Sequence, residues 1–384
     1  DLDFAIQWLP EAGSEEANRL NKDIARHVKA RFCLNEGTHY KYHDELEYAS
    51  EAEKWLQMAA TESDKLITSG RYEIYNTGHP QEDYFNMYRI DDKSDLKEAV
   101  LYVDYKTNIR EHNMAAAGRE AGCGFSKSFV ESFLCSDGLP ISLSNKYLGD
   151  ETMRKETANR DPRLKQLILT NDFPTNVTDD LKDSTFVVNE DEFITQHCFT
   201  GYRPIKGFNP IYSQALYMKS SFDGIAYRYA ETLLINAEAK AELNTITNAD
   251  LDRTVNQLRD RVGMPHLTVN VGFTDPKWPD WGYSLSPVLQ EIRRERCIEL
   301  AGEGFRFNDL KRWKAGKLLN NVLTYVGKRK PDGNLAIVYP NYTNPDLSYQ
   351  AGKSRTWEDK MYLYPIPTGE LQRNPQLLPQ NPGW

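Results

Sequence analysis

The sequence predicts a mainly α-helical protein with a large irregular part and a few short strands. Three observations lead to this prediction. Three pairs of segments have apolar residues at helical spacing, the region between the first and second pairs is rich in turn-forming residues, and the last segment of the chain is rich in proline.

The first predicted helical hairpin spans about 21–72. Its first helix is Asn21–Gly37, which we expect to end at the glycine. In the second helix, Ala49–Tyr72, apolar and small residues recur every three or four positions and form one face. The Ser69-Gly70 step near its end is a typical helix stop, because glycine readily adopts a left-handed conformation.

A second hairpin is predicted at about 225–263. Its first helix, Ile225–Asn244, has a face of alanine and leucine, and the small residues let another helix approach closely. Its second helix is Thr247–Gly263, for which Thr247 or Asn248 is a suitable N-cap.

A third hairpin is predicted at about 284–319, where Pro287 fits a first helical turn. Antiparallel hairpins with alanine-rich inner faces resemble tetratricopeptide-type units. The three hairpins are unevenly spaced, however, and show no regular repeat of about 34 residues.

The region 73–224 is rich in Asp, Asn, Gly, Pro and Tyr and has few clear helical patterns. Short strands are predicted at Ala99–Tyr105 and Thr185–Asn189. A compact domain rarely contains so much loop, and long ordered loops usually serve function. We therefore expect this region to have a functional role.

The C-terminal segment 362–384 combines prolines with apolar side chains. Proline excludes a regular helix and a central strand, and the segment is too apolar for a solvated disordered tail. We expect an extended wrap of turns whose hydrophobic side chains dock on the rest of the protein.

Charge and cysteine content exclude several classes of function. A net charge of −9 argues against nucleic-acid binding, which needs a basic surface. No stretch of the sequence approaches 18 consecutive apolar residues, the length that indicates a membrane span. The five cysteines show no zinc-binding spacing; a single disulfide, for example between Cys123 and Cys135, stays open.

Two motifs that could indicate catalysis or metal binding are incomplete. Gly124–Ser128 resembles a nucleophile elbow but lacks its final glycine. His39 and His43 are four positions apart but lack the glutamate of the HExxH zinc motif. We predict no catalytic site, no metal site and no cofactor.

One predicted helix carries an acidic stripe, Glu291, Glu295, Glu299 and Glu303. Carboxylates could act as the general acid and base of a helical glycosidase. We favour ion pairs with nearby arginines, because such ladders are common on helices. The arginines considered as partners are Arg293, Arg294, Arg296 and Arg306.

Aromatic residues in two loops indicate carbohydrate binding. Flat rings interleaved with polar side chains suit a sugar, whose C–H face stacks on a ring while its hydroxyl groups form hydrogen bonds. The alternative is that these rings hold the loops on the helical scaffold. The candidate residues are Tyr202, Phe208, Tyr212, Trp278, Trp281 and Tyr283.

Several segments resemble the SusD/RagB family, in matching order and spacing over most of the chain. They are "DGLPISLSNKYLGD" (137–150), "NRDPRL" (159–164), "RYAETLLINAEAKAEL" (228–243), "LRDRVGMP" (258–265), "IRRERCIELAGEGFRFNDLKRW" (292–313) and the closing "YLYPIPTGELQRNPQLLPQNPGW" (362–384). The C-terminal tail and the segment 292–313 are the most specific of these.

The resemblance implies one SusD-like domain over 1–384, in which tetratricopeptide-like hairpins pack against an irregular, loop-rich half that carries the ligand site. It further implies a non-enzymatic, glycan-binding lipoprotein on the outer-membrane surface of a Bacteroidetes bacterium. Such a protein would cover a SusC-like TonB-dependent transporter and pass ligand to it.

The chain departs from the family pattern at its N-terminus, since the lipid-modified cysteine and the first helical unit of family members are absent from it. We therefore expect this domain to be N-terminally incomplete and part of the site to lie elsewhere. The loops before the "RYAETLL" helix make Tyr202, Phe208 and Tyr212 the first candidates. A peptide-binding family member and a tetratricopeptide-type scaffold that binds protein stay open as alternatives.

Overall fold

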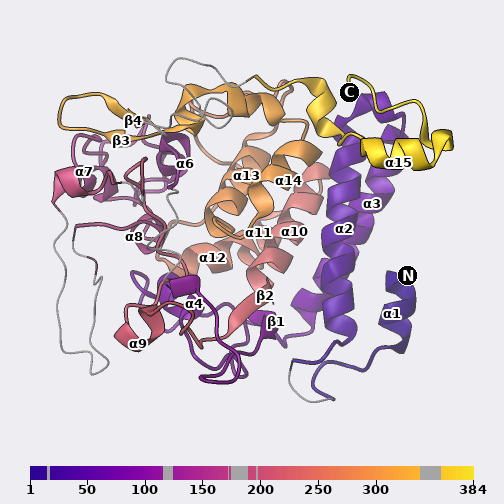
Figure 1. Cartoon of the computed structure of the whole chain (residues 1–384), viewed down its shortest axis with the longest axis horizontal. Coiled ribbons are helices and arrows are strands. Elements are labelled where there is room, and N and C mark those ends of the chain that lie inside the picture. The colour runs from indigo at the N-terminus through magenta and orange to yellow at the C-terminus, as the bar shows by residue number, and fades with distance from the viewer. Residues whose placement is uncertain (15–17, 116–123, 172, 174–188, 196–197, 338–355) are drawn as a thin grey trace.

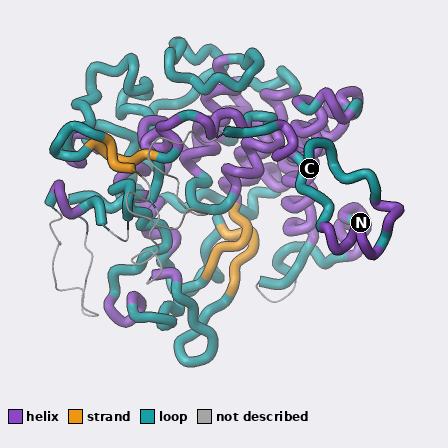
Figure 2. The backbone as a smooth tube through the Cα atoms, turned by 45° about the horizontal axis from the view of Figure 1, so that its top comes forward, coloured by secondary structure: helices purple, strands orange, loops and turns teal. Residues whose placement is uncertain are grey.

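The computed structural model describes residues 1–14, 18–115, 124–171, 173, 189–195, 198–337 and 356–384. Helices gather on one side of the molecule and loops on the other, which confirms the predicted fold class (Figures 1 and 2). The helices of the helical side are α1 Leu2–Trp8, α2 Lys22–Tyr42, α3 Ala52–Thr68, α10 Tyr229–Glu242, α11 Asn248–Asp252, α12 Val255–Arg261, α13 Pro287–Glu299 and α14 Phe305–Arg312.

In the part of the chain that the structure describes, the irregular side has short helices and two small sheets. Its helices are α4 Asp83–Tyr88, α6 Lys127–Ser132, α7 Met153–Thr157, α8 Arg163–Leu167 and α9 Tyr212–Ala215. The antiparallel strand pairs are β1 Ala99–Val103 with β2 Gly224–Arg228, and β3 Val326–Arg329 with β4 Leu335–Ile337. Single turns of 3₁₀ helix are η1 Asp44–Leu46, η2 Ala49–Glu51, η3 Glu190–Glu192, η4 Gly316–Asn320, η5 Val322–Thr324, η6 Asp359–Tyr362 and η7 Pro375–Leu377.

Gly37 lies inside α2, not at its end, which corrects the sequence prediction. A Cβ atom at this position would lie 2.8 Å from Cγ and 2.9 Å from the backbone nitrogen of Leu56 in α3. The glycine is needed because α2 and α3 approach closely here. Since no left-handed turn occurs at Gly37, α2 continues to Tyr42.

Helix α10 is the centre of the helical side, where it contacts α2, α3, α12 and α13, and nearly all of its residues are buried. It begins at Tyr229, four residues later than predicted, because residues 224–228 form strand β2 and pair with β1. The predicted helix over Thr247–Gly263 is divided into α11 and α12. Thr247 caps α11 in a capping box with Asp250, as expected for this N-cap.

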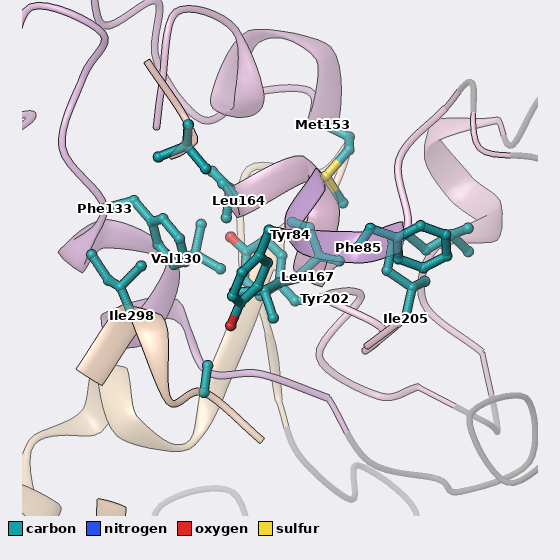
Figure 3. Packing of buried hydrophobic residues seen from close by; sticks show 14 of the residues in the cluster. Tyr84, Phe85, Val130, Phe133, Met153, Leu164, Leu167, Tyr202, Ile205 and Ile298 are labelled. Carbon is teal, nitrogen blue, oxygen red and sulfur yellow. The ribbon is translucent and has the colours of Figure 1, made fainter. Parts of the chain in front are cut away.

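The irregular side has its own hydrophobic core, which is shared with α13. Figure 3 shows Phe133 of the irregular side beside Ile298 of α13, and Leu164 and Tyr202 belong to the same cluster. All four side chains are almost fully buried. The loops are therefore ordered by burial against the helices. The strand predicted over Thr185–Asn189 lies outside the described residues except for Asn189, which is not in a strand.

Glu299 of the acidic stripe binds arginines from three other elements, which corrects the expected pairing along one helix. Its carboxylate accepts hydrogen bonds from Arg228 Nη1 at 2.6 Å, Arg261 Nη2 at 2.6 Å and Arg163 Nη1 at 2.9 Å. All four side chains are buried. Burial alone would raise the pKa of Glu299, but the three guanidinium groups lower it well below its usual value.

Of the other expected ion pairs, one forms within α13 and one arginine binds a different helix. Arg294 does bind Glu291 within α13, at 3.1 Å. Arg293 instead binds Glu242 of α10 at 2.9 Å, and both of these side chains are buried. Glu295, Glu299 and Glu303 thus bind cations of other elements, whereas Glu291 pairs within α13.

The C-terminal segment lies against the end of the helical side near α2 and α3 (Figure 1). Tyr362 is buried and accepts a hydrogen bond from the backbone of Gly316. Two details differ from the prediction. Residues 368–373 form the short helix α15, Thr368–Arg373, because no proline interrupts them. Moreover, Tyr364 and Leu378 are 69% and 57% exposed, so much of the segment's apolar surface is not docked.

Candidate functional site

A cleft of about 1400 Å³ lies between α2, strand β2, the loop around residue 113 and the start of α14. From α2 it is lined by Arg31, Asn35 and His39, which are four residues apart and therefore share one face of the helix. The loop-rich side contributes the opposite lining. We refer to this opening as the cleft.

Rings and polar groups alternate in the lining on the side of β2. The ring of His112 meets those of Tyr105 and Phe222 edge to face, with centroids 4.4 and 4.6 Å away. His112 Nε2 donates to the backbone oxygen of Phe222, which fixes the orientation of the imidazole. Asp223 accepts the backbone N–H of Tyr105 at 2.7 Å. Apolar surface with a few oriented polar groups is typical of a ligand site.

The carboxylates of Glu303 and Asp309 in the cleft are paired with cations. Glu303 accepts hydrogen bonds from Lys206 Nζ at 2.6 Å and Arg228 Nε at 2.9 Å. Arg296 Nε donates to both carboxylate oxygens of Asp309, at 3.1 and 3.0 Å. Burial opposes ionisation, but the neighbouring cations lower the pKa of Glu303 and of Asp309, so both are charged near neutral pH.

Two connected loops, one of which contributes Asn113 and Met114 to the cleft lining, carry exposed apolar side chains. Tyr212 and Tyr217 are 56% and 72% exposed. The two loops are joined, because Asn113 of the cleft lining accepts the backbone N–H of Met218. We call these residues the rim patch: Ile109, Met114, Tyr212, Leu216, Tyr217 and Met218, all of them exposed.

The candidates of the 200–217 loop separate into two groups in the structure. Tyr202 and Phe208 are buried in the core that Figure 3 shows in part. Tyr202 donates its hydroxyl to Glu156, 2.8 and 2.9 Å from the two carboxylate oxygens. Tyr212 is exposed and belongs to the rim patch. A buried ring has no free face for a sugar, so the binding role of Tyr202 and Phe208 stays a prediction without support from their positions.

The candidates of the 274–287 loop lie away from the cleft lining. Trp281 is buried and packs edge to face on Trp313. Trp278 is half-buried, and its Nε1 donates to Glu291 at 2.7 Å. Tyr283 stacks on Tyr42 with ring centroids 4.4 Å apart and borders a separate pocket of about 440 Å³. The structure thus does not bring the two candidate loops together.

Sequence reasoning missed the residues that line the cleft. Arg31, Tyr105, Phe222 and Phe305 come from four distant segments. Phe305 lies within the SusD-like segment 292–313, but nothing in that segment predicts that it meets the other three residues. The one available signal was the cluster of rings and polar residues around 105–114, which has no helical or strand periodicity.

His39 and His43 stack with ring centroids 4.0 Å apart at the C-terminal end of α2. Within the described ranges, no group of three or more His, Cys, Asp or Glu side chains is arranged to hold a metal ion. In the same ranges, no helix has the length and apolar character needed to cross a membrane.

Comparisons with known proteins agree with this architecture. The model of the SusD family matches residues 59–384. SusD-like protein P2 from Formosa agariphila is 33% identical over 166 residues, which cover 43% of this chain and 27% of that protein. The matched part is therefore about a quarter of that relative's length.

Two crystal structures of Bacteroides fragilis proteins share the fold. One is a SusD-like protein with a TM-score of 0.69 and 24% identity; the match covers all of this chain and 69% of that one. The other is a SusD-like carbohydrate binding protein with a TM-score of 0.64 and 22% identity; the match covers 98% of this chain and 69% of that one. The family match, extending over most of the chain, shows that this protein belongs to the SusD family.

Proposed function

We propose that this protein binds glycans without catalysis, at the cell surface, and passes them to a SusC-like TonB-dependent transporter. The observation that carries the proposal is the cleft. Its volume of about 1400 Å³ exceeds the range of typical small-molecule pockets. Rings and hydrogen-bonding groups both line it, and that combination suits an oligosaccharide.

The rim patch supplies the stacking surface that the proposal needs. Tyr212 and Tyr217 have exposed phenol rings and belong to the loop whose Met218 backbone is bound by Asn113 of the cleft lining. Each ring can stack on the C–H face of a sugar while its hydroxyl group forms hydrogen bonds. Of the six residues predicted from the sequence, Tyr212 is the one that the proposal retains as a direct contact.

Absence of catalysis is supported by the state of two carboxylates in the cleft. A glycosidase needs one protonated carboxyl group as a general acid. Glu303 and Asp309 are each held ionised by cations, so neither is suited to that role.

The cellular part of the proposal rests on family membership. One of the compared B. fragilis structures is named as a carbohydrate binding protein. The resemblance to SusD proteins implies placement on the outer membrane through an N-terminal lipid anchor and association with a SusC-like transporter. Co-purification with the outer-membrane transporter from the native organism tests this part.

Affinity electrophoresis against soluble polysaccharides tests the binding itself. We expect at least one glycan to retard the protein and the double variant Tyr212→Ala/Tyr217→Ala to weaken this retardation. Stacking of a nucleobase on an aromatic side chain contributes about 1–3 kcal/mol to binding, and a sugar stacks on a ring in a similar way. Tyr48→Ala is the matched control, because Tyr48 is 55% exposed and lies outside the cleft lining and the rim patch.

The outcomes separate the alternatives. Retardation that Tyr48→Ala weakens as much as the double variant would contradict the proposed site. No retardation by any glycan, together with binding of peptides, would favour the peptide-binding or tetratricopeptide-scaffold reading. Release of sugar from a bound polysaccharide would show a glycoside hydrolase.

A further inference from the structure

Helix α14 begins in the lining of the cleft. The backbone N–H groups of its first turn receive no hydrogen-bond acceptor from the side chain of the N-cap residue, which is a glycine. The N-cap is Gly304, in the left-handed region with φ 85°, and it provides no side-chain hydrogen bond to the first turn. The first N–H groups of a helix also lack acceptors within the helix. A Cβ atom at Gly304 would meet no atom of the described residues within 4 Å, so these residues leave space beside the helix start.

A buried cation with an unused donor lies at the same place. Arg296 is 3% exposed and uses Nε to bind Asp309, whereas its Nη1 has no hydrogen-bond partner among the described residues. Of the residues in the described ranges with a buried, unpartnered side-chain atom, Arg296 is the one that lines the cleft. A buried guanidinium nitrogen without a partner costs free energy, which a bound acceptor would recover.

A ring fixes two guanidinium groups beside the helix start. Phe305, the first residue of α14, has the guanidinium carbon of Arg31 5.1 Å from its ring centroid and that of Arg296 5.4 Å away. Arg31 comes from α2 and Arg296 from α13, so the two cations approach Phe305 from different helices. Arg31 is also held by Glu231, to which its Nε donates at 2.6 Å.

Cationic side chains outnumber carboxylates in the lining of the cleft itself. Five cationic side chains line it, against three carboxylates, although the chain has a net charge of −9. The cationic residues are Arg31, Lys206, Arg296, Lys311 and Arg312, and the acidic ones are Asp223, Glu303 and Asp309. Arg31 and Arg312 are paired with Glu231 and Glu238, which lie outside the lining. An anionic ligand is therefore indicated by the unpartnered Nη1 of Arg296 and by the free N–H groups at the start of α14, not by net charge.

We infer that the α14 end of the cleft is a subsite for an anionic group, a carboxylate or a sulfate ester, carried by the bound glycan. Arg296, Arg31 and the first N–H groups of α14 form this subsite, and Asn308, an exposed residue of the cleft lining, borders it. The inference rests on the proposed function and narrows its ligand to an acidic polysaccharide. Guanidinium groups and helix N-termini both favour planar or tetrahedral oxyanions.

The test compares acidic polysaccharides with their neutral counterparts by affinity electrophoresis and calorimetry. The probes are polygalacturonate and hyaluronan with their carboxyl-reduced forms, and κ-carrageenan with its desulfated form. We expect a charged form to bind more tightly than its neutral counterpart, and its affinity to fall as sodium chloride is raised from about 0.05 to 0.5 M. Tighter binding of polygalacturonate or hyaluronan than of its carboxyl-reduced form would indicate a carboxylate subsite. Tighter binding of κ-carrageenan than of its desulfated form would indicate a sulfate subsite.

Asn308→Asp is the decisive variant, because it adds one negative charge beside the subsite with almost no change in shape. It should lower the affinity for the charged glycan about fivefold or more, and lower the affinity for the neutral form clearly less. Asn270→Asp makes the same change at an exposed position outside the cleft lining and should have no effect. Asp near a helix start is compatible with folding.

Each contrary outcome is informative. Equal binding of charged and neutral forms, or equal effects of the two variants, would overturn the anion subsite and leave the proposed function standing. Binding of neutral glycans alone would have the same consequence. If the protein bound poly-glutamate and none of the polysaccharides, both the proposed glycan-binding function and the glycan subsite would be overturned, since the ligand would be an acidic peptide. Failure to bind any of these probes would overturn the inference.

Discussion

The guanidinium of Arg261 donates from Nη2 to both carboxylate oxygens of Glu299, at 2.6 and 2.7 Å, and both side chains are completely buried. This contact joins α12 to α13. The same carboxylate binds Arg163 of the irregular side and Arg228 at the end of β2. One glutamate therefore links the helical hairpins to the loops that line the cleft.

Glu299→Gln should destabilise the protein by about 3–5 kcal/mol, because it leaves buried guanidinium groups without a compensating charge. Denaturant-induced unfolding measures the difference. Glu370→Gln is the matched control: Glu370 binds Arg373 at 3.0 Å, but both side chains are largely exposed, so its loss should cost about 1 kcal/mol or less. Similar small effects of the two variants would contradict a structural role for the Glu299 cluster.

Gly37→Ala should destabilise the protein by about 1–3 kcal/mol, because the added Cβ would lie 2.8 Å from Leu56 Cγ and force α2 and α3 apart. Gly369→Ala in α15 adds a Cβ that meets nothing within 4 Å, so it should be neutral or stabilising by up to about 1 kcal/mol. Thermal unfolding of the two variants gives opposite shifts if α2 is packed as described. A stabilised Gly37→Ala protein would show that the helices are further apart.

The His39 imidazole should make stability depend on pH in the mildly acidic range. Burial, and then the neighbouring His43, lower the pKa of His39 to about 4, against 6.5 for an unperturbed histidine. Between these values the unfolded chain binds a proton that the folded protein does not. The free energy of unfolding should therefore fall as pH drops from about 6.5 to 4, and this part of the fall should end below pH 4.

His39→Gln removes this contribution. Its stability should decline less than that of the parent protein between pH 6.5 and 4, as denaturant unfolding at several pH values would show. Parallel curves for the two proteins would mean that His39 titrates normally and is not shielded by α2 and its stacked partner.

Tyr202→Phe should lower the free energy of unfolding by about 1–3 kcal/mol, because the buried carboxylate of Glu156 loses a hydroxyl donor. Tyr212→Phe, at an exposed ring, should change stability by less than about 0.5 kcal/mol. Glycan affinity measured for the same two variants shows whether each tyrosine packs in the core or contacts the ligand. If Tyr202→Phe were fully stable and bound ligand more weakly, the sequence-based site would be favoured over the one described above.

The hairpins were predictable from the sequence because their signals are local. One short segment contains the whole pattern of apolar residues in α3, and another contains the capping box of Thr247 with Asp250. The role of Gly37 was not predictable, since a glycine that ends a helix and one that admits a neighbouring helix look the same in the sequence. Only the position of Leu56 separates the two cases.

The site was less predictable than the fold for the same reason. Tyr202 and Tyr212 are ten residues apart in one aromatic loop, yet one is buried and the other is 56% exposed. Arg31 and Arg296 are far apart in the chain and become neighbours only through their shared contact with Phe305. Burial and long-range proximity are properties of the fold, which composition and spacing do not report.

The central claim, that the cleft holds the glycan, is tested most directly by filling it. Asn308→Trp places a large side chain in the cleft lining, whereas Asn270→Trp places one on the surface elsewhere. Calorimetry with a glycan that binds the parent protein should show at least a tenfold loss of affinity for Asn308→Trp and none for Asn270→Trp. Unchanged binding by a folded Asn308→Trp protein would show that the ligand binds outside the cleft.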